Sequence, residues 1–178
     1  NISLAGTVLS INFGNSSHLE LNFVDDQMLS WSAQGEISIA SGTEDPYDAV
    51  AVREDVTFIN LPLTSVERES LTIAHSARTG RVIIAHSVIA PEKVEGTPQV
   101  QQRFWAGTVD GAEVTGEEPA DSRDLIGMRN VYRYSPSHLY EHVYISTQRY
   151  AWQCLEGIQR GHGDMDLSTV WKLDDGLY

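Results

Sequence analysis

The sequence is poor in cysteine and has no long hydrophobic run, and each shortage excludes a class of protein. Among its 178 residues Cys154 is the one cysteine, so no disulfide framework can form within the chain and a cytoplasmic, reducing compartment is expected. No apolar stretch approaches the ~18 to 20 residues that a helix needs to cross a bilayer. We therefore expect no membrane partner, and we expect Cys154 to be a small buried hydrophobe and not a nucleophile.

Positive charge is also scarce. The chain has 12 lysines and arginines against 25 aspartates and glutamates, a formal net charge of −13. This balance argues against nucleic acid and anionic membranes as partners, because nothing offsets the repulsion from their phosphates. Lys93 and Lys172 are the only lysines, which leaves few candidates for Schiff-base chemistry. Gly-rich phosphate-binding loops and the Gly-x-Ser-x-Gly motif of hydrolases are absent as well.

What the sequence does contain is a long series of period-2 patterns. In residues 18–23 the apolar Leu19, Leu21 and Phe23 alternate with polar residues, as in a half-buried strand. Thr79-Gly80 and Asp110-Gly111 are typical of hairpin turns. Strands are expected at residues 7–13, 18–23, 28–32, 37–40, 50–53, 56–61, 70–77, 81–90, 100–109, 130–135, 139–146, 149–155 and 167–173.

Such a meander predicts an all-β fold. A sheet of this length exposes two edges unless it closes, so an up-and-down antiparallel barrel is expected, with an open sandwich as the alternative. Only residues 45–49 and 65–69 have a briefly helical pattern. The acidic segment 112–124 is interpreted as a solvated loop, although a domain linker stays open, and residues 1–178 are predicted to form a single domain.

Aromatic and ionisable side chains gather after residue 130. On a strand, Tyr140, His142 and Tyr144 share one face about 7 Å apart, and Glu141 points to the other. In a wet barrel interior they could transfer protons and donate hydrogen bonds to a small ligand. The alternatives are a structural role for the aromatic residues and a role in an interface, including a homodimer.

A metal site is not expected. His162, Asp164 and Asp166 alternate in a Gly-rich stretch and could converge on an ion, but aspartates in such turns also bind their own backbone. His138 and His142 have a spacing that suits zinc on a helix, whereas on a strand it separates them by about 13 Å. We predict no metal and no cofactor.

The C-terminal third resembles the MoaF family. The residues that carry the resemblance are Tyr140-Glu141-His142-Val143-Tyr144, residues 150–157, Asp164 and the final Asp174-Asp175-Gly176-Leu177-Tyr178. The resemblance implies a lipocalin-like (calycin) barrel and, through the family's name, an association with molybdenum cofactor biosynthesis. It implies no catalytic residue. In such relatives the final strand is expected to continue past Leu177-Tyr178.

Together these observations predict a barrel that binds a small molecule and performs cofactor-free isomerase, cyclase or lyase (decarboxylase) chemistry in its lumen. His142 is the expected proton carrier, Tyr140 and Tyr144 the hydrogen-bond donors, and Glu141 the acid/base candidate if it, and not His142, faces inward. The expected ligand-binding residues are Trp105, Arg133, Arg149, Tyr132, Tyr150 and Trp152. The alternative is a non-catalytic carrier or accessory protein with the same pocket.

Overall fold

The computed structural model describes residues 1–14, 16–37 and 44–178. The chain folds into two compact units, Asn1–Pro119 and Ala120–Tyr178. The boundary between them falls inside the acidic segment 112–124, where the sequence leaves a linker open. The single domain over the whole chain stays a prediction.

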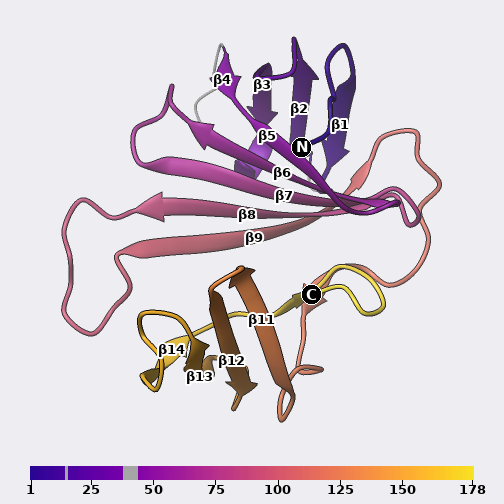
Figure 1. Cartoon of the computed structure of the whole chain (residues 1–178). Coiled ribbons are helices and arrows are strands. Elements are labelled where there is room, and N and C mark those ends of the chain that lie inside the picture. Colours follow the sequence, from indigo (N-terminus) through magenta and orange to yellow (C-terminus); the bar gives the residue numbers. More distant parts are fainter. Residues whose placement is uncertain (15, 38–43) are drawn as a thin grey trace. The chain divides into compact units, whose positions relative to one another are not determined.

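The N-terminal unit is one antiparallel sheet of nine strands in the order β4-β3-β2-β1-β9-β8-β7-β6-β5 (Figure 1). Strands that are adjacent in the sheet are also consecutive in sequence, except where β1 meets β9. A short 3-10 turn, η1 (Gly35–Ile37), follows β3. The strands are β1 (Val8–Asn12), β2 (His18–Phe23), β3 (Met28–Gln34), β4 (Asp45–Pro46), β5 (Asp48–Arg53), β6 (Val56–Leu63), β7 (Glu69–Ser76), β8 (Arg81–Ile89) and β9 (Val100–Val109).

The alternating pattern of the strands builds the core of this sheet. In β2 the buried Leu19, Leu21 and Phe23 alternate with exposed or half-buried polar residues, as predicted. Leu71 and Ile73 of β7 are fully buried in the same cluster. The β7–β8 turn uses Gly80 at φ +66°, a conformation that glycine adopts without steric cost. The inward side of the sheet is therefore filled with apolar side chains.

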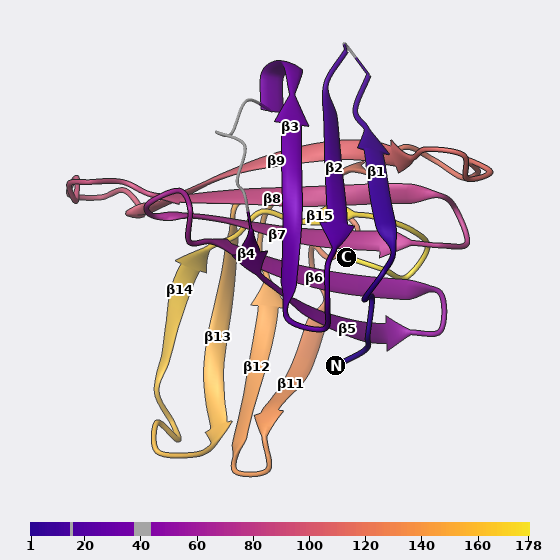
Figure 2. The ribbon, with the colours of Figure 1, turned by 90° about the horizontal axis from the view of Figure 1, so that it is seen from above.

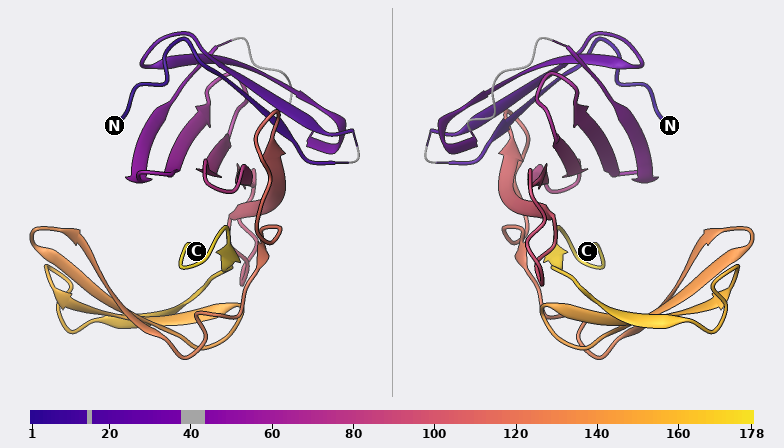
Figure 3. Two further views of the ribbon diagram at one scale, coloured as in Figure 1. Left: turned by 90° about the vertical axis from the view of Figure 1, so that its right-hand side faces the viewer. Right: turned by 90° about the vertical axis from the view of Figure 1, so that its left-hand side faces the viewer.

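The sheet curves until its two ends nearly meet, since β4 at one edge lies against β6 near the other (Figure 3). Asp45 of β4 links these ends and is fully buried. Its carboxylate accepts hydrogen bonds from Trp31 Nε1 at 2.7 Å, Thr64 Oγ1 at 2.5 Å, and the backbone and hydroxyl of Ser65 at 2.9 and 2.6 Å. Four donors compensate for the cost of burying this carboxylate.

The C-terminal unit contains a four-stranded antiparallel sheet in the order β11-β12-β13-β14, visible side by side in Figure 2, and a two-stranded pair, β10-β15. Its strands are β10 (Ala120–Asp121), β11 (Arg129–Ser135), β12 (His138–Tyr144), β13 (Arg149–Glu156), β14 (Gly163–Leu167) and β15 (Trp171–Lys172). A β-bulge interrupts the β11–β12 register between Arg133 and Ser135.

The predicted fold class is confirmed as all-β with a nearly closed up-and-down sheet. Three local predictions are corrected. Residues 45–49 and 65–69 are not helical, because Asp45 joins a strand and bonds to Ser65. Residues 163–166 belong to β14 and not to a turn, because they pair with β13. The predicted strand 37–40 lies outside the described residues after Ile37. No helix in the described part of the chain has the length and apolarity to cross a membrane.

Candidate functional site

The four-stranded sheet has two chemically different faces, which the strand register defines. His142 pairs with Asn130 on one side and with Trp152 on the other, and Tyr144 pairs with Tyr150. Directly paired residues point to the same side of a sheet. We call this side the aromatic face. Its members are Asn130, Tyr132, Tyr134, His138, Tyr140, His142, Tyr144, Tyr150, Trp152, Cys154, Asp164 and Asp166.

The opposite side carries the arginines of the sheet, and we call it the arginine face. Its members are Arg129, Val131, Arg133, Leu139, Glu141, Val143, Arg149, Ala151, Gln153, Leu155, Met165 and Leu167. Glu141 is ion-paired with Arg129, and Arg133 Nη1 lies 3.2 Å from the carboxylate of Glu156. Strand alternation has thus put every arginine of β11–β13 on one side.

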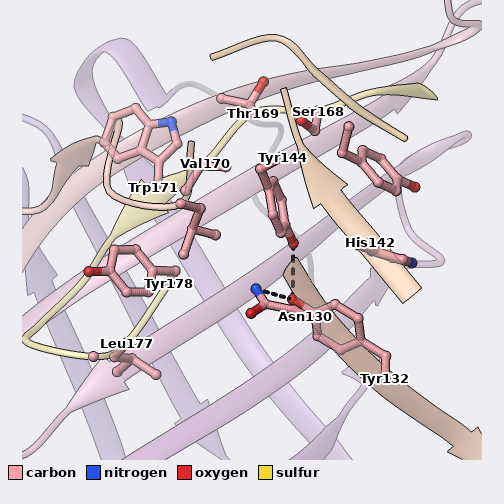
Figure 4. A pocket seen from close by; sticks show the side chains of 13 residues that line it. Asn130, Tyr132, His142, Tyr144, Ser168, Thr169, Val170, Trp171, Leu177 and Tyr178 are labelled. Atoms are coloured by element: carbon pink, nitrogen blue, oxygen red, sulfur yellow. Dashed lines mark hydrogen bonds between the residues drawn. The ribbon is translucent and has the colours of Figure 1, made fainter. Parts of the chain in front are cut away.

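A pocket of about 490 Å³ lies on the aromatic face (Figure 4). Rings from the sheet form one part of its wall, and the segment that follows β14 forms the other. Its volume falls within the ~300 to 1,000 Å³ typical of small-molecule sites. The lining residues are Leu125, Asn130, Tyr132, His142, Tyr144, Tyr150, Ser168, Thr169, Val170, Trp171, Gly176, Leu177 and Tyr178.

The ring of His142 is held between two tyrosines. Its centroid lies 4.6 Å from that of Tyr132 and 4.7 Å from that of Tyr150, and the Tyr134 hydroxyl approaches Nε2 to 3.4 Å. Burial lowers the pKa of His142 from its usual 6.5, and the charge of Asp166 opposes part of that shift. His142 is therefore an uncharged imidazole at neutral pH, able to accept a proton.

Further tyrosine hydroxyls line the pocket that His142 enters. The hydroxyls of Tyr132 and Tyr144 share a hydrogen bond of 3.0 Å, and Asn130 Nδ2 donates to the Tyr132 oxygen at 3.4 Å (Figure 4). Burial, followed by the hydrogen bond to Tyr132, raises the pKa of Tyr144. Burial and the charge of Asp166 raise the pKa of Tyr150. These phenols stay protonated and offer hydrogen-bond donors to an oxygen atom of a ligand.

The structure brings four of the predicted site residues together at the pocket. They are Tyr132, His142, Tyr144 and Tyr150. Two others lie on the aromatic face beyond the lining. Tyr140 donates to Gln159 Oε1 at 2.8 Å, and Trp152 Nε1 donates to Asp166 at 2.8 Å, with the two rings 5.7 Å apart.

Other predicted site residues do not reach the pocket. Glu141 points to the arginine face, so by the criterion set from the sequence His142 is the acid/base candidate. Arg133 and Arg149 also lie on that face, because they alternate along their strands with the residues of the aromatic face. Trp105 belongs to β9, where it packs against the hydrophobic core. The sequence placed the pocket in the lumen of a single barrel, whereas the pocket lies on the four-stranded sheet of the C-terminal unit.

The candidate metal ligands do not form a cluster. Asp164 and Asp166 lie in β14, and among the described residues no group of three or more His, Cys, Asp or Glu side chains could hold an ion. Cys154 is buried, as predicted, and its Sγ donates to the Glu156 carbonyl at 3.2 Å.

Sequence reasoning missed the contribution of residues 168–178. Ser168, Thr169 and Trp171 line the pocket, and so do Leu177 and Tyr178. The final residues carried the family resemblance, which was a signal of their importance. Their contact with the sheet arises from tertiary packing, which no local pattern encodes.

Two family models match the chain. The MoaF N-terminal domain matches residues 2–91, and the MoaF C-terminal domain matches residues 119–178. The second match begins one residue before Ala120, where the C-terminal unit starts. The chain is also 30% identical over 193 residues to "Protein MoaF" of Klebsiella aerogenes, an alignment that covers 98% of this chain. The chain spans 66% of the length of that relative.

Proposed function

The chain belongs to the MoaF family, and from the pocket in its C-terminal unit we propose that it binds a small organic molecule and moves a proton on it without a cofactor. The observation that carries this proposal is the imidazole of His142, which lies between the rings of Tyr132 and Tyr150 in a pocket of ligand size, where burial lowers its pKa. A neutral base beside protonated donors suits general acid/base catalysis near neutral pH.

The simplest reaction that these groups support is an isomerisation. His142 accepts a proton from a carbon next to a carbonyl group, while a hydroxyl of the Tyr132–Tyr144 pair donates a hydrogen bond to the carbonyl oxygen, where negative charge develops. His142 then returns the proton to another atom of the same substrate. Substrate and product contain the same atoms, so no oxidant, reductant or co-reactant is consumed. Cyclisation by the same groups is balanced in the same way.

The test is the exchange of carbon-bound hydrogen in deuterium oxide. With β-tetralone, a neutral bicyclic ketone, the protein is expected to catalyse incorporation of deuterium next to the carbonyl, measured by NMR. His142→Gln should lower the rate about 100-fold or more, the usual size of a general-base effect. The matched control is His138→Gln, on the same strand and face but outside the pocket lining, where Nδ1 lies 2.8 Å from the Ser135 hydroxyl.

Three outcomes would overturn the catalytic part of the proposal. They are the absence of exchange with the wild-type protein, exchange that His142→Gln leaves unchanged, and an equal loss in both variants. Binding of β-tetralone without exchange would assign the pocket to a carrier.

A further inference from the structure

The charges around the pocket restrict what can enter it. Among the described residues that form its lining there is no lysine, arginine, aspartate or glutamate. Lys172, which follows the lining residue Trp171 in sequence, is ion-paired with Asp124 at 3.6 Å and Asp175 at 2.9 Å. Within the four-stranded sheet, Arg129, Arg133 and Arg149 point to the other face. The lining of the pocket therefore supplies no lysine or arginine to neutralise an anionic ligand.

Negative charge, in contrast, borders the site. Asp166 lies on the aromatic face opposite Tyr150, and its charge acts on both Tyr150 and His142. At the other wall, the hydroxyl of the lining residue Tyr178 donates to Asp124 at 2.9 Å. An anion in the pocket would lose hydration and meet repulsion from Asp166, while the charge of Asp124 is offset by Lys172 and the lining offers no lysine or arginine in return.

The pocket does offer hydrogen bonds to uncharged groups. Ser168 contributes a buried hydroxyl oxygen that has no hydrogen-bond partner among the described residues. A buried polar atom without a partner is costly, and a ligand that bonds to it removes that cost. The Tyr132–Tyr144 hydroxyl pair and Asn130 belong to strands β11 and β12 (Figure 4). The rings of the lining residues Tyr150 and Trp171 provide flat apolar surface.

We infer that the pocket takes an uncharged ring compound bearing a carbonyl or hydroxyl oxygen and rejects the carboxylate or phosphate form of the same compound. The inference rests on the proposed function because it concerns the same pocket, but it is about binding and does not require turnover. It replaces the sequence-based expectation that Arg133 and Arg149 are ligand-binding residues.

The test compares two probes of the same shape and different charge, β-naphthamide and β-naphthoate, by equilibrium titration at a pH of about 7.5, where the carboxylic acid is ionised. The wild-type protein should bind the amide at least about tenfold more tightly, which corresponds to ~1.4 kcal/mol. Ser168→Ala should weaken amide binding by about two- to tenfold, the usual effect of one neutral hydrogen bond.

A variant with an added positive charge tests whether charge in the pocket determines this preference. Thr169 lines the pocket and is exposed, so Thr169→Lys places an ammonium there without burying it. This variant should reduce the preference for the amide by about threefold or more, as expected for an added charge near the ligand. Thr147→Lys is the matched control, because it adds the same charge at an exposed turn outside the lining and should leave the ratio unchanged.

The inference fails if β-naphthoate binds as tightly as β-naphthamide, if neither probe binds, or if the two lysine variants change the ratio equally. These results are distinct from those that test catalysis. Preference for the amide without deuterium exchange would retain the inference and overturn the catalytic proposal. Exchange that depends on His142, together with preference for the carboxylate, would retain the catalytic proposal and overturn the inference about charge.

Discussion

The two sheets of the molecule use the same alternation for different purposes. In the nine-stranded sheet one side of each strand carries aliphatic residues, such as Leu71 and Ile73, and these fill a core. In the four-stranded sheet the equivalent positions carry tyrosine, histidine and tryptophan, and the tyrosines Tyr132, Tyr144 and Tyr150 line a pocket with His142. A period of two therefore shows that one side differs from the other, and the side-chain types show whether that side is a core or a site.

Substitution in the core of the nine-stranded sheet should have the largest effect on stability. Leu71→Ala removes a fully buried side chain and should lower the free energy of unfolding by about 2 to 5 kcal/mol, because lost burial and a cavity add together. Val52→Ala is the control, since Val52 is 52% exposed in β5. Urea unfolding measures both. Equal effects of the two variants would show that the side assigned to the core is wrong.

The buried carboxylate of Asp45 should have the next largest effect. Asp45→Ala leaves the donors of Trp31, Thr64 and Ser65 without their acceptor and should cost ~2 to 3 kcal/mol. Asp48→Ala is the matched control, because Asp48 is exposed and accepts a hydrogen bond from the Asn1 side-chain amide at 3.2 Å. If the two variants unfold at the same urea concentration, Asp45 does not hold the ends of the sheet together.

The same carboxylate should make the stability of the protein depend on pH. Burial would raise the pKa of Asp45, but hydrogen bonds from Ser65, Thr64 and Trp31 outweigh that effect and leave the pKa below its usual 3.8. The stability that this group contributes is therefore fully present above pH 3.8 and is lost as the pH falls through the lowered pKa. The stability difference between wild type and Asp45→Ala, measured by urea unfolding at several pH values, should shrink in that direction. A difference that grows on acidification would contradict this assignment.

On the aromatic face, protonation of His142 at acidic pH should have a moderate effect on stability. Its ring is faced by Tyr132, Tyr134 and Tyr150, and by the charge of Asp166. Burial lowers the pKa below 6.5, so protonation on acidification from 6.5 down to the folded-state pKa should reduce stability and remove the proposed base.

NMR titration of the imidazole measures this pKa. Asp166→Asn removes the one charge that raises it and should lower it further, whereas Asp175→Asn should not change it. A rise of the pKa in Asp166→Asn would contradict the proposed electrostatics of the pocket.

Substitution on the arginine face should have the smallest effect on stability and on ligand binding. Arg149→Ala removes an exposed side chain that does not line the pocket and should change stability by less than about 0.5 kcal/mol. It should leave the affinity for β-naphthamide unchanged, as measured by the same titration. A loss of affinity would show that Arg149 contributes to ligand binding, as the sequence predicts. It would contradict the assignment of the ligand site to the aromatic face alone.

The sequence predicts the fold class and one strand of the site, because both follow from the alternation of residues within single strands. Alternation in residues 139–146 places Tyr140, His142 and Tyr144 on one side and Glu141 on the other, and the register agrees. The same rule, applied to Arg149 and Tyr150, separates the arginine from the aromatic residues. Applying parity to every candidate would have excluded Arg149 from the aromatic face.

The remaining features depend on contacts that no local pattern specifies. The division into two sheets depends on which strands pair, and β14 was mistaken for a turn because its glycine and aspartates favour turns and are uncommon in strands. The residues of 168–178 reach the pocket through tertiary packing. The buried Asp45 network joins β4 to residues that follow β6, and an isolated aspartate in the sequence does not reveal such donors.

The most direct test of the central claim is to map where β-naphthamide binds on the whole chain by NMR chemical-shift perturbation. The account predicts that the largest changes cluster on the aromatic face and the segment beside it, at Tyr132, His142, Tyr144, Tyr150 and Ser168. Changes centred on the apolar side of the nine-stranded sheet, around Leu71, Ile73 and Trp105, would place the site inside that sheet and contradict the account.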